Sequence, residues 1–125
     1  MTLRRLELLQ WLGLLLGAAV FAAQLVVGFG ITQAECGAPG GSRFGIRNDL
    51  WQGVLLGISV ALVLAAEASA VAVFLGTRRV TYEHPPPDGR IRFLAIAAMA
   101  ANVIFLVIIL LSGLASILSA VCRQA

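Results

Sequence analysis

Three polar side chains lie within long apolar stretches of this sequence, where a polar group is expensive to keep. Gln24 and Asn102 are amides, and Glu67 is an acid. A carboxyl group inside a membrane is a candidate proton-relay or ion-pathway group. The alternative is a protonated or hydrogen-bonded Glu67 that joins helices or meets a partner subunit. The joining role is favoured, because the sequence places no second acid, Lys or His at the same depth.

The two cysteines each follow an apolar stretch. Cys36 comes after the first stretch and Cys122 after the third. If each stretch crosses a membrane, both cysteines face the same outer, oxidising side, where disulfides form. We therefore predict a Cys36–Cys122 bridge that joins the ends of two helices, with Cα atoms within roughly 7 Å. The alternative is two unrelated small apolar residues.

Other chemistry has little support in this sequence. His84 is the single histidine, and it lies in a loop beside Pro85, Pro86 and Pro87 rather than at membrane depth. One histidine cannot supply both axial ligands of a haem within a bundle. The chain has no Lys and no CxxCH motif. We predict no catalytic, cofactor-binding or metal-binding residue, and we expect that the chain is not an enzyme by itself.

The elements that position these residues are three apolar runs, at about 8–32, 50–77 and 91–121. The chain has 125 residues, 60% hydrophobic and 12% charged, with a mean hydropathy of +0.97. A helix spans the hydrocarbon core with about 20 apolar residues, and all three runs exceed that length. The first run is also too long for the apolar core of a signal peptide. The sequence predicts one all-α domain, 1–125, with three transmembrane helices.

The arginines give this bundle an orientation. Six of the nine basic residues precede the first run or flank the second loop, and three lie on the opposite side. Positive residues favour the cytoplasmic side. We therefore expect a cytoplasmic N-terminus and an outer C-terminus, in a multi-pass protein of a bacterial inner membrane. Because the arginines stand beside apolar runs rather than in a block, no nucleic-acid partner is expected.

The runs also contain residues that could join the helices. Counted from the cytoplasmic ends, Glu67 and Asn102 lie at similar depth, so a hydrogen bond between them is predicted, while Gln24 lies nearer the outer face. Small residues four positions apart let helix backbones approach closely. Three such pairs predict the packing faces of a compact bundle, one pair in each run: Gly13 and Gly17, Gly53 and Gly57, and Ala97 and Ala101.

Two segments resemble a known group of proteins. The third run begins Gly89-Arg90-Ile91-Arg92-Phe93-Leu94-Ala95 and leads to Val121-Cys122, and the first run ends Gln33-Ala34-Glu35-Cys36. These features resemble small three-span proteins encoded beside bacterial cytochrome c oxidase genes. The resemblance implies an accessory subunit of a haem-copper oxidase or a related respiratory complex. Its partners would be other integral membrane subunits and lipids, with haem and copper held in the partner subunits and none bound by this chain alone.

Two other functions stay open. One is a small homo-oligomeric transporter or channel with Glu67 lining its path, although three spans are few and no broken helix is evident. The other is a membrane-assembly factor. The shortage of His, Met and paired Cys argues against metal delivery by such a factor.

Overall fold

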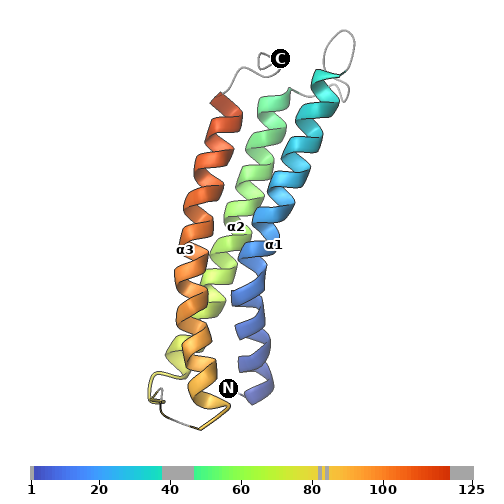
Figure 1. Ribbon diagram of the computed structural model, residues 1–125. Helices are drawn as coiled ribbons and strands as arrows, with labels where there is room; N and C mark the ends of the chain where they lie inside the picture. The colour runs from blue at the N-terminus through green and yellow to red at the C-terminus, as the bar shows by residue number, and fades with distance from the viewer. Residues whose placement is uncertain (1, 38–46, 82, 84, 119–125) are drawn as a thin grey trace.

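The computed structural model describes residues 2–37, 47–81, 83 and 85–118, and their regular structure is entirely helical. It consists of α1 (Leu3–Cys36), α2 (Asn48–Gly76) and α3 (Asp88–Leu118). The helices run up, down and up side by side (Figure 1), and every pair of them is in contact. All three are long and apolar enough to span a membrane. The predicted all-α class with three transmembrane helices is therefore confirmed.

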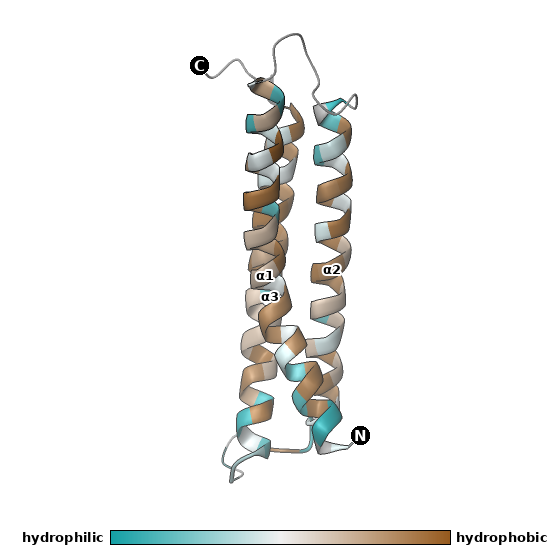
Figure 2. Ribbon diagram, turned by 90° about the vertical axis from the view of Figure 1, so that its right-hand side faces the viewer, coloured by the Kyte–Doolittle hydropathy of each residue, from teal (hydrophilic) through white to brown (hydrophobic). Residues whose placement is uncertain are grey.

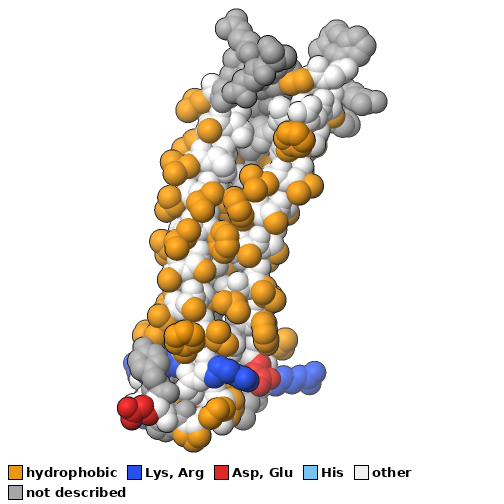
Figure 3. Space-filling model, viewed as in Figure 1, with side chains coloured by type: hydrophobic (Ala, Val, Ile, Leu, Met, Phe, Trp, Pro, Cys, Tyr) orange, Lys and Arg blue, Asp and Glu red, His pale blue; other side chains and the backbone are white. Residues whose placement is uncertain are grey.

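The helices are longer than a bilayer requires. α1 has 34 residues, which corresponds to about 50 Å at 1.5 Å per residue, against a hydrocarbon core of about 30 Å. α1 also includes the charged residues Arg4, Arg5 and Glu7, so it begins before the apolar run does. Hydrophilic residues gather toward the two ends of the bundle (Figure 2), and apolar side chains cover the length between them (Figure 3).

The two ends of the bundle carry different elements. At one end, here called the Cys36 end, α1 and α3 finish and α2 begins; at the other, the Arg92 end, α1 and α3 begin and α2 finishes (Figure 1). This arrangement places the start of α1 and the segment between α2 and α3 on one side, because consecutive helices run in opposite directions. Which end faces the cytoplasm stays a prediction.

The core between the helices is narrow and contains many small side chains. One apolar cluster is formed by Val20, Val63 and Ile109, and a second by Val73, Ile91 and Ala95. Alanines supply much of the remaining buried surface: Ala66, Ala70 and Ala98. Large apolar side chains point outward along all three helices. This distribution is typical of helices that pack through small residues and present large ones to lipid.

Arg92 fastens the connection between α2 and α3. Its Nη1 donates to the carbonyl oxygens of Thr77 at 3.1 Å, Arg78 at 2.6 Å and Val80 at 2.5 Å. Its guanidinium also lies 5.4 Å from the ring centroid of Phe74. A cation beside the last carbonyls of a helix is stabilising. The first turn of α3 therefore holds the end of α2.

Candidate functional site: the polar contacts between the helices

The most enclosed polar contact joins α3 to α1. Asn102 is 1% exposed, and its Nδ2 donates a 2.9 Å hydrogen bond to the carbonyl oxygen of Gly13. The main-chain oxygen of Gly13 is already the acceptor of its own helix, and a carbonyl can accept a second bond. Gly17 makes the room: a Cβ at that position would collide with Oδ1 of Asn102. The amide therefore occupies a niche that the missing side chain of Gly17 leaves open.

The same part of α1 also approaches α2 closely. A Cβ at Gly13 would lie only 3.1 Å from the main-chain nitrogen of Ala70 and 3.2 Å from its Cα. The pair Gly13 and Gly17 thus packs against both other helices, α2 at Gly13 and α3 at Asn102. The packing predicted for this pair is present.

The predicted hydrogen bond between Glu67 and Asn102 is wrong. Asn102 donates to Gly13 instead, and both Oδ1 of Asn102 and Oε2 of Glu67 are buried without a hydrogen-bond partner. The two residues are at similar depth, since Gly13 contacts Asn102 and also Ala70, which is three residues from Glu67. The prediction failed because depth does not fix direction: the Asn102 amide faces α1, whereas Glu67 is half-buried on α2.

Gln24 makes a second contact from α1 to α3. Its Nε2 donates to the carbonyl oxygen of Ile109 at 3.4 Å, and its Oε1 is buried without a partner. The residue is 7% exposed. Like Asn102, it uses its amide donor on a main-chain oxygen of the neighbouring helix.

Gln52 adds a third contact, which the sequence had not suggested. Its Nε2 donates to the carbonyl oxygen of Gly28 at 3.2 Å and to Oγ1 of Thr32 at 3.1 Å. Gln52 is 5% exposed, although it is the fifth residue of α2 and so lies near a helix end, where a solvated side chain would be expected. The available signal was Gly28 on α1, because a glycine leaves its main-chain oxygen accessible to a neighbouring amide.

Of the other two predicted packing pairs, Gly53 and Gly57 do not pack within this bundle, and the packing of Ala97 and Ala101 stays a prediction. Nothing lies within 4 Å of a Cβ built at Gly53 or Gly57, so neither packs against α1 or α3. On α3, Ala97 and Ala101 are only half-buried. The small residues that α3 buries are Gly89, Ala95, Ala98 and Gly113. Small residues are frequent on all faces of these helices, so their spacing alone did not identify the packed face.

The remaining candidates lie at the helix ends. Cys36 ends α1, and the described part of the chain contains no free cysteine. Cys122 lies outside the described residues, so the Cys36–Cys122 bridge stays a prediction. His84 also lies outside them. Pro85 to Pro87 lead into α3, where the carbonyl oxygen of Pro87 accepts from the main-chain N–H of Ile91 at 3.0 Å.

These polar contacts join one helix to another. Asn102, Gln24 and Gln52 each donate to a main-chain oxygen of another helix. Within the described ranges, no three His, Cys, Asp or Glu side chains gather as a metal site would require. No family model, curated protein or solved structure matches this chain.

Proposed function

We propose that this chain is a non-catalytic accessory subunit of a multi-subunit respiratory complex in a bacterial inner membrane, with cytochrome c oxidase as the complex. The observation that carries the proposal is the outward face of α2. Small residues lie exposed along it, and nothing lies within 4 Å of a Cβ at Gly57. The members of this face are Gly57, Ala61, Ala65 and Ala68.

A lipid-facing helix has no need of such a surface. Transmembrane helices associate through close backbone approach at small residues, because lipid is as apolar as the helices themselves. Gly13 already shows this contact inside the bundle, against Ala70. The outward face of α2 offers the same kind of surface with no helix of this chain on it. A helix of another subunit is the partner that fits it.

The internal polar groups support a structural rather than a transporting role. The donors of Gln24, Gln52 and Asn102 are all used between helices of this chain. Among the described residues of the three spans, Glu67 is the one ionisable group away from the helix ends. The resemblance of the first and third spans to proteins encoded beside cytochrome c oxidase genes supports the choice of complex. Haem and copper then belong to the partner subunits.

Purification in mild detergent tests the proposal. The expected result is co-migration with larger membrane subunits and a haem absorption spectrum in the purified assembly. A homo-oligomer without haem would contradict it and favour the transporter or channel, for which Glu67→Gln should then abolish proton or ion flux in liposomes. Association with precursors only, and loss from the finished complex, would favour an assembly factor.

A pair of matched variants tests the α2 face itself. Gly57→Leu should release the chain from the complex, because the leucine would separate the two helix backbones. Gly30→Leu on α1 is the control, since a Cβ at Gly30 also meets nothing within 4 Å. Equal retention of the two variants in the complex would show that the outward face of α2 is not the contact surface.

A further inference from the structure

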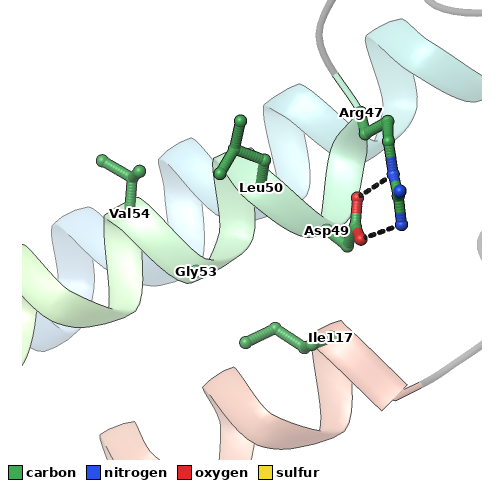
Figure 4. Close-up of a pocket in the computed structure, with 6 residues that line it drawn as sticks. All are labelled: Arg47, Asp49, Leu50, Gly53, Val54 and Ile117. Atoms are coloured by element: carbon green, nitrogen blue, oxygen red, sulfur yellow. Dashed lines mark hydrogen bonds and ion pairs between the residues drawn. The ribbon is translucent and has the colours of Figure 1, made fainter.

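A groove opens between α2 and α3 at the Cys36 end of the bundle. Below the groove, α2 and α3 are in close contact at Leu56 and Gly113. A Cβ on the glycine would lie 2.5 Å from Cδ1 of the leucine. One turn farther on, the helices leave a space of about 560 Å³. Four lining residues come from the start of α2, one directly precedes it and one comes from α3 (Figure 4): Asp49, Leu50, Gly53 and Val54, then Arg47, and Ile117.

The groove is apolar along its length and charged at its rim. Leu50 and Val54 are 59% and 49% exposed, and nothing lies within 4 Å of a Cβ at Gly53. Arg47 and Asp49 stand immediately before the apolar part of α2. This sequence of a charged rim followed by an apolar wall matches the order of headgroup and acyl chain in a lipid leaflet.

The charged rim is an ion pair with unused bonding capacity. Nε of Arg47 donates to Oδ1 of Asp49 at 3.1 Å, and Nη2 donates to Oδ2 at 2.5 Å. The side chains are 85% and 42% exposed. The Nη1 amino group remains directed away from this pair, and each carboxylate oxygen can accept another bond. The rim therefore presents both a donor for an anion and an acceptor for a cation.

We propose that this groove binds a zwitterionic phospholipid with a primary ammonium headgroup, phosphatidylethanolamine. One acyl chain lies along Leu50, Gly53 and Val54 on α2 and Ile117 on α3. The headgroup phosphate binds the guanidinium of Arg47 in a charge-assisted hydrogen bond, and the ammonium binds the carboxylate of Asp49. The assignment goes beyond the accessory role and does not depend on it.

Charge complementarity selects this headgroup over the other common ones. An anionic headgroup such as that of phosphatidylglycerol supplies a phosphate for Arg47 but no cation to balance the carboxylate of Asp49. A phosphatidylcholine headgroup matches the charges, but its quaternary ammonium has no N–H to donate. Of these three headgroups, only that of phosphatidylethanolamine supplies both a phosphate for Arg47 and a charged N–H donor for Asp49.

Lipid-dependent stability of the purified full chain in detergent micelles tests the proposal. Thermal unfolding is followed by circular dichroism with added phosphatidylethanolamine, phosphatidylglycerol or phosphatidylcholine at equal mole fraction. Phosphatidylethanolamine should raise the unfolding temperature most, because a ligand that binds only the folded state stabilises it. Asp49→Asn should abolish its advantage over phosphatidylglycerol. An equal or larger shift with phosphatidylglycerol in the unaltered chain would overturn the proposal.

Two variants that fill the groove, one from each wall, test its location. Gly53→Leu on α2 and Ile117→Trp on α3 should each lose the phosphatidylethanolamine shift. Gly30→Leu is the control, because it adds the same side chain at an open position of α1. The two variants fill the groove from different helices. If one of them does not fold, the other still tests the site. A full lipid shift in a folded groove-filling variant would exclude the site. The site would also be excluded if such a variant lost its co-purifying subunits but kept the lipid shift.

Discussion

Asn102 in α3 and Gly13 in α1 are joined by a 2.9 Å hydrogen bond from the side-chain amide to the main-chain oxygen, in the buried interior of the bundle. The glycine serves two helices at once, since its missing side chain also admits the backbone of Ala70. A single residue of α1 thus contacts both neighbouring helices. This arrangement leads to specific expectations for stability.

Asn102→Ala should destabilise the bundle. The change removes an interhelical hydrogen bond, and such bonds contribute about 0.5–2 kcal/mol in membrane proteins. The free energy of unfolding in mixed micelles measures the loss. Val103→Ala on the neighbouring, 53% exposed position is the control. Equal losses in the two variants would show that the hydrogen bond contributes nothing.

Gly17→Ala should be coupled to Asn102. In the unaltered chain the new methyl group would collide with Oδ1 of Asn102 and displace the amide from Gly13. In the Asn102→Ala background the collision is absent, so the same change should cost less by about 1 kcal/mol, a usual coupling for residues in contact. A double-mutant cycle of unfolding free energies measures the difference, and strict additivity would contradict it.

Gly13→Ala should destabilise more than the same change at an open glycine. Its Cβ would lie 3.1 Å from the backbone of Ala70, which can yield only if α1 and α2 separate. Overpacking of this kind costs about 1–3 kcal/mol. Gly30→Ala is the control and should be neutral or stabilising by up to about 1 kcal/mol, because alanine favours a helix over glycine. Reversal of this order would refute the close approach.

Arg92→Ala should loosen the connection between α2 and α3. It removes the donor to the carbonyls of Thr77, Arg78 and Val80. Hydrogen bonds from a charged donor contribute about 1.5–3 kcal/mol where they are sheltered, and less where water competes. Faster hydrogen exchange of the Val80 amide, which donates to Thr77 at 2.9 Å, is the expected result. Arg90→Ala, at an exposed position, should leave that exchange rate unchanged.

The predicted bridge between Cys36 and Cys122 is open to direct measurement. Under denaturing, non-reducing conditions a maleimide–polyethylene glycol reagent should label neither cysteine, and after reduction it should label both. Labelling of both cysteines without reduction would exclude the bridge. The same reagent reports orientation: single cysteines introduced at Arg79 and at Asp49 should be labelled from opposite sides of the membrane, with Arg79 on the cytoplasmic side.

The sequence by itself determined the number of helices, their approximate limits and the positions of the polar residues along them. Runs of apolar residues longer than a bilayer must be buried in lipid, and a helix is the form that satisfies their backbone there. Depth follows directly from position in such a helix, which is why Glu67 and Asn102 were correctly placed at one level. The contact of Gln52 with α1 was not predicted, because Gln52 is near a helix end, where polar residues are common.

Only the tertiary structure decided which faces of the helices meet. In water, the apolar face of a helix identifies its packed side, but in lipid both the packed and the exposed sides are apolar, so the pattern loses that information. The same packing role was therefore predicted for Gly13 and Gly57. In the structure a Cβ at Gly13 would meet Ala70, whereas a Cβ at Gly57 would meet nothing within 4 Å. For the same reason, Asn102 was predicted to bond Glu67, which lies at a similar depth. The rotation of α3 about its axis instead directs the amide to Gly13.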